Sequence, residues 1–287
     1  MIPAQNIVEW SQTAPWAERR QVEQDLIISR ALVEIFGDPF LASELRFRGG
    51  TALNKLHFPE PLRYSEDIDL VRTSAGPIGP ILDRLRERLE PWLGPARFEQ
   101  SQVAPKFRFR VRAEDGGEHP IRLKLEVNTR EVNAYDPVLM APFAVENPWF
   151  SGASTIPTFS NEEMLATKLR ALLQRDKGRD LYDLAHGLEV FSGLDYPRVV
   201  ELFTQYLADG DTPISRAQAE ERMLAKLARG NLLMDLRPLL SADSAASIND
   251  DATGYAVRDI FEKLIGEIPG DAWARTPEAK ERLGIDW

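Results

Sequence analysis

The segment Phe47-Arg-Gly-Gly-Thr-Ala-Leu-Asn-Lys-Leu56 joins a strand pattern to a helix pattern through two glycines. Residues 45–48 alternate apolar and charged side chains, as a half-buried strand does. A helix is expected to begin at Thr51, directly behind Gly49 and Gly50. Unpaired backbone N–H groups at a helix N-terminus attract anions, and glycine lets a ligand approach the backbone closely. This order predicts a phosphate cradle, although a Gly-Gly pair alone also suits an ordinary turn.

An aspartate pair follows in Ser65-Glu-Asp-Ile-Asp-Leu-Val71. Alternate side chains of a strand share one face at a rise of about 3.3 Å per residue, so Asp67 and Asp69 stand roughly 6.6 Å apart at the backbone. Ile68 and Leu70 then face the core. Mg²⁺ or Mn²⁺ accepts a few carboxylates completed by water and substrate phosphates, which makes the pair a candidate metal site. Two solvated aspartates at the end of a strand would show the same pattern.

A hairpin is expected from residues 105–112 and 121–128, because both segments alternate charged and apolar side chains around a glycine-rich turn. Glu126 shares its face with basic residues and is expected to complete a carboxylate triad with the two aspartates. The basic side chains of that face form a cationic ladder of Arg108, Arg110, Arg122 and Lys124. The alternative is a hairpin with one solvated face.

A further charged cluster lies in residues 163–184. Leucines at helical spacing form a buried stripe there, and Lys168 lies near its edge. The other members gather where the next helix is expected to start, and they are Lys177, Arg179, Asp180 and Asp183. Lysines at a helix edge are commonly just solvated, so this cluster indicates chemistry only together with the preceding motifs.

The remaining pattern divides the chain into a mixed half and a helical half. Helices are expected over 15–36 and 78–92, with the strand 68–71 between them. Beyond Pro148 the patterns are helical only, at 161–174, 178–191, 196–208, 214–229 and 254–267, with a Ser/Ala/Asp-rich linker at 241–253. A boundary near 150–158 therefore predicts an α+β domain over 1–155 and a helical domain over 156–287.

Composition excludes several classes of protein. The chain has 287 residues, no cysteine and three histidines, which leaves no disulfide and no Cys-ligated zinc. No apolar run approaches the roughly 18 residues of a transmembrane helix, and the N-terminus lacks a signal peptide pattern, so a cytoplasmic protein that does not contact a membrane is expected. The net charge is 35 − 45 = −10, which argues against general coating of nucleic acid but leaves room for a local basic site.

Together these motifs resemble the AbiEii/AbiGii (MenT-type) nucleotidyltransferase toxins of bacterial toxin–antitoxin and phage-defence systems. The resemblance spans about residues 45–190 and rests on the glycine segment, the aspartate pair, the third-strand acid and the charged cluster at 168–184. It implies an α+β, polymerase-β-like nucleotidyltransferase core with a mixed sheet, followed by a helical C-terminal portion. It also implies Mg²⁺-dependent transfer of a nucleotide from an NTP, a tRNA 3′ end as the acceptor in some relatives, and a cognate antitoxin.

The resemblance also implies roles for residues. The phosphate cradle falls on Gly49, Gly50 and Thr51, the metal carboxylates on Asp67 and Asp69, and the third-strand acid on Glu126 with Lys124 beside it. The last motif falls on Lys168, Lys177, Arg179, Asp180 and Asp183, with Lys168 and either Lys177 or Arg179 facing the triphosphate. Asp180 either orients Lys168 through a salt bridge or contacts the acceptor hydroxyl. Many nucleotidyltransferases have Gly-Ser where this chain has Gly50-Thr51, which keeps the hydroxyl and adds a methyl group.

Two other functions stay open at this point. The same metal site could serve an enzyme that AMPylates or phosphorylates a cognate protein, which the net charge of −10 favours slightly. A non-catalytic interaction protein with this fold is opposed by the intact set Asp67, Asp69 and Glu126. The sequence leaves open which NTP is used, which acceptor receives the nucleotide and how the chain assembles.

Overall fold

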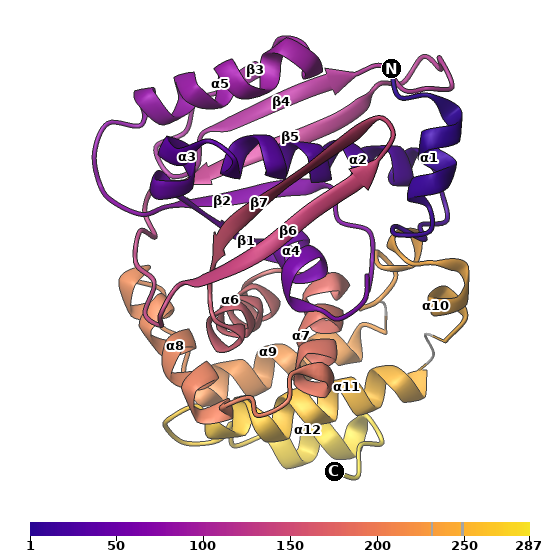
Figure 1. The fold of residues 1–287 in the computed structure, drawn as a ribbon. Coiled ribbons are helices and arrows are strands. Elements are labelled where there is room, and N and C mark those ends of the chain that lie inside the picture. The colour runs from indigo at the N-terminus through magenta and orange to yellow at the C-terminus, as the bar shows by residue number, and fades with distance from the viewer. Residues whose placement is uncertain (231, 248–249) are drawn as a thin grey trace. The chain divides into compact units, whose positions relative to one another are not determined.

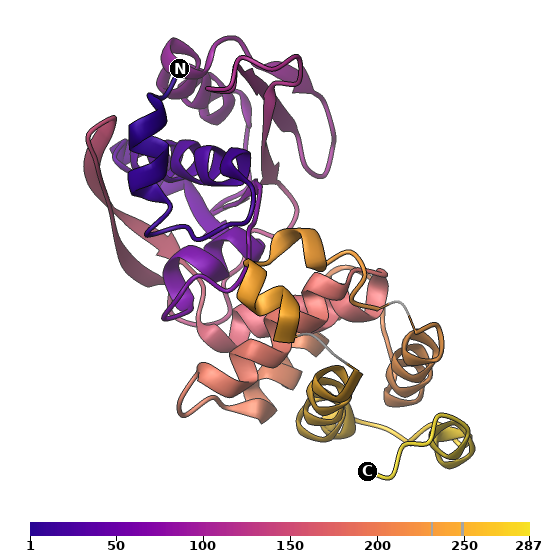
Figure 2. The same cartoon turned by 90° about the vertical axis from the view of Figure 1, so that its right-hand side faces the viewer.

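The computed structural model describes residues 1–230, 232–247 and 250–287 (Figure 1). The chain forms two compact units, residues 1–160 and residues 161–287. In the described part of the chain, the strands all belong to the first unit, and the second unit is built from helices (Figure 2).

The first unit is organised by a seven-stranded mixed sheet. In spatial order its strands are β3 (Arg97–Glu99), β4 (Lys106–Val111), β5 (Ile121–Asn128), β2 (Asp67–Arg72), β1 (Leu45–Arg48), β7 (Phe150–Thr158) and β6 (Leu139–Asn147). β2 pairs with β5, and β1 with β7, in parallel, whereas the other pairs are antiparallel. The mixed sheet, the strand 45–48 and the hairpin of β4 with β5 confirm the predictions.

The hairpin of β6 and β7 was not predicted. Its turn falls at Asn147-Pro148, where the sequence pattern indicated only a boundary between domains. Pro142 lies within β6 and weakens the strand pattern, but β6 is an edge strand, where a missing N–H is tolerated. The short strand β3 was missed as well.

Helices pack on the sheet of the first unit (Figure 1). They are α1 (Ala4–Trp10), α2 (Arg19–Phe36), α3 (Pro39–Glu44), α4 (Gly49–Ala52), the π-helical turn η1 (Leu53–His57) and α5 (Gly79–Leu93). α2 contacts α5 and three strands, and it buries Leu26, Ile27 and Leu32 completely. The helix expected from residue 15 starts at Arg19, because Glu18 and Gln21 form a capping box there.

The second unit consists of helices around a leucine-rich core. They are α6 (Asn161–Gln174), α7 (Gly178–Val190), α8 (Tyr196–Asp209), α9 (Arg216–Ala228), η2 (Arg237–Leu239), α10 (Ala242–Ser247), α11 (Asp250–Lys263), η3 (Ile265–Glu267) and α12 (Thr276–Arg282). α6 packs against α7 and α8, and α7 packs against α11. The predicted helices are confirmed, with α11 starting earlier than expected. The expected linker 241–253 contains α10, and its residues Ile248 and Asn249 lie outside the described part.

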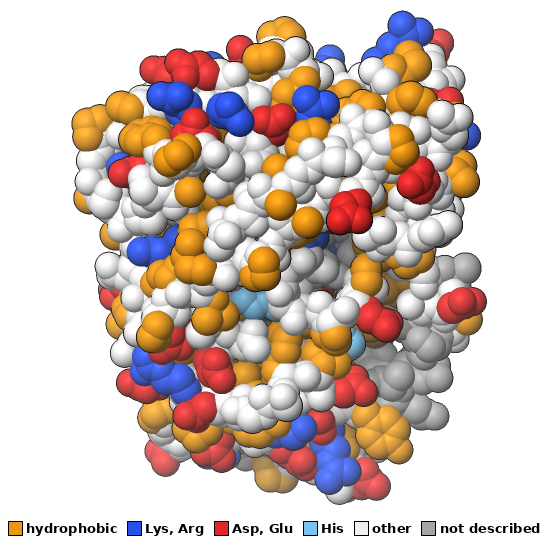
Figure 3. Space-filling view, in the orientation of Figure 1, with side chains coloured by type: hydrophobic (Ala, Val, Ile, Leu, Met, Phe, Trp, Pro, Cys, Tyr) orange, Lys and Arg blue, Asp and Glu red, His pale blue; other side chains and the backbone are white. Residues whose placement is uncertain are grey.

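The surface in Figure 3 carries charges of both signs. Lys and Arg side chains lie among Asp and Glu side chains on the face drawn, so the net charge of −10 is not gathered there into one acidic patch (Figure 3). Among the described residues, no helix combines the length and the apolar character needed to cross a membrane.

Candidate active site

The charged side chains of β2 and β5 share one face of the sheet. The parallel register pairs Asp67 with Lys124 and Asp69 with Glu126, and paired residues of neighbouring strands point to the same side. The intervening Ile68, Leu70, Leu125 and Val127 are buried. Strand alternation therefore brings the two aspartates and the glutamate to one face, as the sequence pattern predicts.

Lysines neutralise the carboxylates of this face. Lys124 Nζ lies 2.8 Å from Asp67 Oδ2 and 3.6 Å from Glu126 Oε2. Lys106 Nζ lies 3.1 Å from the same Glu126 oxygen. Within residues 1–230, 232–247 and 250–287, no three Asp, Glu or His side chains are grouped to hold a metal ion. The three predicted carboxylates thus share a face, but Asp67 and Glu126 form ion pairs with lysines.

The donor set on this face still fits a hard divalent cation. Mg²⁺ takes oxygen ligands and usually keeps several waters or substrate phosphates, so it needs only one or two protein carboxylates. Asp67 and Asp69 provide these on one face of β2, and Glu126 provides a third if its lysines release it. Because all three candidate ligands are carboxylates, these residues fit Mg²⁺ or Mn²⁺.

Asp69 lies in an unfavourable electrostatic position. Burial raises its pKa, the carboxylate of Asp67 raises it further, and Lys124 offsets part of this increase. At neutral pH an ionised Asp69 therefore lowers the free energy of unfolding. A bound cation would offset this destabilisation.

The glycine turn is shaped by this aspartate. Gly49 has φ +86°, a conformation that residues with a side chain rarely adopt, and a Cβ there would collide with the Asp69 carboxylate. A Cβ at Gly50 would collide with the guanidinium of the buried Arg63. The helix starts at Gly49 rather than Thr51, so both glycines belong to its first turn. They are required because charged groups approach the backbone closely.

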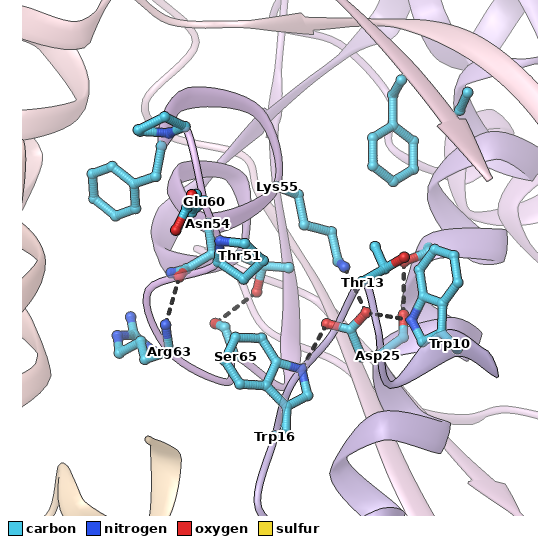
Figure 4. Close-up of a pocket in the computed structure, with 16 residues that line it drawn as sticks. Trp10, Thr13, Trp16, Asp25, Thr51, Asn54, Lys55, Glu60, Arg63 and Ser65 are labelled. Carbon is cyan, nitrogen blue, oxygen red and sulfur yellow. Dashed lines mark hydrogen bonds and ion pairs between the residues drawn. The ribbon is translucent and has the colours of Figure 1, made fainter. Parts of the chain in front are cut away.

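Two polar side chains attach this turn to the segment that leads into β2 (Figure 4). Asn54 donates from Nδ2 to the carbonyl of Gly50 (2.8 Å), and its Oδ1 accepts from the backbone N–H of Leu62 (3.1 Å) and Arg63 (3.0 Å). The Thr51 hydroxyl lies 2.8 Å from Ser65 Oγ and donates to the carbonyl of Asp67 at 2.5 Å. These bonds fix the turn relative to the strand that carries both aspartates.

A cavity of about 180 Å³ lies beside the same helix (Figure 4). Asp25 on its wall accepts from the indole N–H of Trp10 (2.8 Å) and of Trp16 (3.1 Å), and it pairs with Lys55 Nζ at 2.9 Å. Asp25 thereby connects the N-terminal segment to the helical turn η1. Because all three donors are satisfied within the protein, this cluster stabilises the position of η1 and of the glycine turn before it.

The cationic ladder lines a groove of about 680 Å³ that also includes Asp67. The register pairs Arg108 with Lys124 and Arg110 with Arg122, so the four cations lie on the carboxylate face, and Arg97 of β3 extends their row. Arg108 forms an ion pair with Glu99 at 2.7 Å. Arg97, Arg110 and Arg122 are exposed and have no ion-pair partner in the described part of the chain.

The second unit holds its own charged cluster. Lys168 is 6% exposed, and its Nζ lies 3.2 Å from Asp180 Oδ1 and 2.6 Å from Asp183 Oδ2. Arg175 also pairs with Asp180, at 2.6 Å. Burial would raise the pKa of Asp180, but Lys168 and Arg175 together lower it. Lys168 is therefore a buried, paired lysine rather than a solvated one.

The two remaining cations of that motif lie at the start of α7. Lys177 is the exposed N-cap residue and Arg179 is half-buried. Neither has an ion-pair partner among the residues that the structure describes. Both are available to an anion.

The structure thus gathers the sequence-predicted residues into one set per unit, and it adds residues that sequence reasoning missed. These additions are Asn54, Arg63 and Ser65, whereas Lys106 was expected on the basic face of the hairpin and its contact with Glu126 is new. Asn54 sits inside the glycine segment, and Lys106 lies opposite Glu126 in the hairpin register. Side-chain geometry alone reveals their partners.

The sequence that forms this site matches the model of a known protein family. The family model described as the nucleotidyl transferase AbiEii toxin of type IV toxin–antitoxin systems matches residues 30–263, which is more than half of the chain. The chain belongs to the AbiEii family. Membership confirms the predicted family and the predicted enzyme class, a nucleotidyltransferase.

The fold of this AbiEii family member is also similar to solved structures. MenT4, a nucleotidyltransferase toxin from Mycobacterium tuberculosis H37Rv, is 21% identical with a TM-score of 0.65, and the alignment covers 97% of this chain and 98% of MenT4. A putative nucleotidyltransferase from Helicobacter pylori is 19% identical with a TM-score of 0.54, covering 88% of this chain and 100% of the other. No curated protein matches. The predicted fold class is confirmed.

Replacing Gly49 by alanine should impair both folding and activity. A positive φ costs an alanine about 1–2 kcal/mol, and the Cβ would also displace the Asp69 carboxylate. Gly94→Ala is the matched control, because Gly94 has φ +84° and open space where a Cβ would lie. Urea unfolding and nucleotide transfer should show a larger loss for Gly49→Ala than for Gly94→Ala. Equal stability losses with activity retained in both would show that the close approach is unimportant.

Removing the Asn54 amide should loosen the glycine turn. Asn54→Ala breaks three hydrogen bonds of a buried side chain and should lower the free energy of unfolding by about 1–3 kcal/mol. The KM for NTP should rise at the same time. Asn133→Ala, at an exposed asparagine, should change stability by less than about 0.5 kcal/mol. An unchanged KM in Asn54→Ala would separate this residue from nucleotide binding.

Proposed function

We propose that this AbiEii protein is a metal-dependent nucleotidyltransferase that transfers a nucleotide from an NTP to the 3′ end of an RNA, with tRNA as the acceptor class. The observation that carries the proposal is the common face of Asp67, Asp69 and Glu126 next to the glycine turn. Family membership supports the reaction class and an antitoxin partner. We further infer action in the cytoplasm, in toxin–antitoxin and phage-defence biology.

The metal-binding step is assigned to the carboxylate face. Asp67 and Asp69 would hold Mg²⁺ or Mn²⁺, with Glu126 on the acceptor side. A metal bound there supplies charge neutralisation for the attacking and leaving oxygens of an in-line displacement. The chain's own part is to hold these oxygens on one face and to keep Asp69 against the glycine turn.

Triphosphate binding is assigned to backbone N–H groups and to free cations. Gly49, Gly50 and Thr51 form the first turn of a helix, where N–H groups lack partners within the helix. The Thr51 hydroxyl already bonds to Ser65 and to the carbonyl of Asp67. The backbone N–H of Thr51 is therefore the group offered to the β- and γ-phosphates. In the helical unit, the unpaired Lys177 and Arg179 would provide positive charge for the triphosphate.

Lys168 and Asp180 complete the assignment. We propose that Lys168 is the residue of the helical unit that serves catalysis on the nucleotide. The ion pairs of Lys168 with Asp180 and Asp183 support an orienting role for Asp180 over direct contact with the acceptor hydroxyl.

The acceptor is assigned to the groove of the cationic ladder. RNA phosphates need local positive charge, and exposed Arg97, Arg110 and Arg122 provide it next to Asp67 in a chain of net charge −10. This placement favours RNA over a neutral or basic protein surface as the molecule that approaches the carboxylates.

The decisive experiment incubates the protein with each α-labelled and γ-labelled NTP in the presence of total RNA and total protein. Transfer of α-label to RNA, dependent on divalent metal, supports the proposal. Label appearing on a protein, with RNA unlabelled, would replace it by AMPylation (α-label) or phosphorylation (γ-label) of a partner.

Asp67→Asn and Asp69→Asn should both abolish transfer, because each removes a ligating charge while keeping the side-chain volume. Their effects on stability without metal should differ in sign. Asp69→Asn should raise the free energy of unfolding by about 1 kcal/mol, since the pKa of Asp69 is raised and its ionised form is unfavourable. Asp67→Asn loses the ion pair with Lys124 and should not gain stability. Urea titrations at pH 7 test both signs, and transfer by either variant would contradict the assignment.

Charge reversal in the groove should weaken RNA labelling selectively. Arg110→Glu with Arg122→Glu removes two unpaired cations and should reduce labelling at least tenfold, with a small change in KM for NTP. Labelling by the unaltered protein should fall steeply between about 50 and 200 mM salt. Arg282→Glu on the exposed surface of α12 is the control. If the double variant labels RNA like this control, the groove is not the RNA surface.

A further inference from the structure

Lys124 occupies a special place among the cations of the groove. It stands directly opposite Asp67 in the parallel register and two residues before Glu126 on its own strand. Its ammonium is within ion-pair distance of both carboxylates, at 2.8 Å and 3.6 Å. Arg110 and Arg122 line the same groove and contact neither carboxylate.

The ion pair with Lys124 involves a carboxylate that a bound cation would also need. The side chains of Lys124 and Asp67 are only 23% and 27% exposed, so water screens their attraction less than at the open surface. Asp67 is also one of the two aspartates proposed as metal ligands. A metal ion that binds Asp67 therefore competes with the ammonium of Lys124 for the charge of this carboxylate.

Lysine is suited to such an exchange. Its charge sits at the end of a flexible four-carbon stem, so the ammonium can move several ångströms while the strand stays fixed. Lys106 differs, because its ion pair is with Glu126 and involves neither aspartate. Lys124 alone of these two touches a residue of β2.

We propose that Lys124 is an exchangeable counter-cation of the carboxylate face. It neutralises Asp67 and Glu126 before metal binds, and it yields Asp67 to the metal ion that arrives with NTP. Its ammonium then pairs with the negative charge of the triphosphate. The inference rests on the proposed function, in which Asp67 is a metal ligand.

The exchange couples the two binding events. Metal alone must break the Lys124 ion pair without replacing it, so it binds weakly. NTP offers the released ammonium a new partner, so metal and nucleotide each favour binding of the other, as linkage requires. The carboxylate face would thus load with metal chiefly when nucleotide is present.

The test compares metal binding and nucleotide use in Lys124→Met. Titration calorimetry with Mn²⁺ alone should show binding about tenfold tighter than in the unaltered protein, because the competing ammonium is gone. The KM for the NTP found in the labelling experiment should instead rise. Opposite changes distinguish exchange from a structural role, since a damaged site would bind both ligands more weakly.

Two controls isolate the contact. Arg110→Met removes the same charge from the same groove without touching a carboxylate, so its Mn²⁺ affinity should change much less than that of Lys124→Met. Lys124→Arg retains a cation and should bind Mn²⁺ as weakly as the unaltered protein. Thermal unfolding verifies that each variant is folded, and Lys124→Gln, which also removes the charge, takes the place of Lys124→Met if that variant does not fold.

Specific outcomes overturn the inference. Mn²⁺ affinity in Lys124→Met that equals that of Arg110→Met would reduce the effect to general charge, and weaker affinity would assign Lys124 a structural role. Tighter binding in Lys124→Arg than in the unaltered protein would also exclude competition by charge. The calorimetric arm needs no turnover, so failure of the labelling experiment would remove the proposed transfer reaction without being confused with failure of this exchange.

Discussion

The parallel pairing of β2 with β5 in one register is the constraint on which the site depends. It sets Asp67 beside Lys124 and Asp69 beside Glu126, so three carboxylates and one ammonium share one face of two neighbouring strands. Because side chains alternate between faces along a strand, a shift of one residue would turn Glu126 and Lys124 away from the aspartates. The apolar residues between them prevent that shift, since they are buried on the opposite face. Core packing therefore specifies the geometry of the charged face.

The glycine turn depends on the same strand. Asp69 approaches Gly49 so closely that no side chain fits there, and Asn54 and Thr51 bond the turn to the segment before β2. The turn and the aspartates are consequently connected by direct contacts, which preorganise this part of the site. Preorganisation of this kind is valuable in phosphoryl and nucleotidyl transfer, where positioning and charge stabilisation provide most of the catalysis.

Much of this could be predicted from the sequence, for reasons that are local. Strand alternation placed Asp67, Asp69 and Glu126 on one face, and the leucine stripe of α6 located the buried side of that helix. The hairpin of β6 and β7 was missed, because Pro142 and a weak alternation hide an edge strand. The capping residue Glu18 and the helix α1 were also missed, because both depend on contacts rather than on periodicity.

Within the candidate site, the structure differs from the sequence-based expectations in individual side-chain contacts. No pattern shows that Asn54 contacts the carbonyl of Gly50, or that Lys106 and Lys124 neutralise the carboxylates, since these are distances between atoms that the sequence pattern does not fix. Lys168 was expected at the edge of its helix, and its burial follows from two aspartates on α7 that compensate its charge.

Each unit balances its buried charges internally. In the first unit, Lys106 and Lys124 compensate the carboxylates of β2 and β5, and Asp25 is compensated by Lys55 and two indoles. In the second unit, Asp180 and Asp183 compensate Lys168 and Arg175. An unpaired buried charge is very costly, so each half can form its cluster before ligands arrive. The proposed exchange at Lys124 depends on this charge compensation. The ion pair of Lys124 with Asp67 stabilises the carboxylate face without metal, and a metal ion replaces Lys124 there when NTP offers the ammonium a new partner.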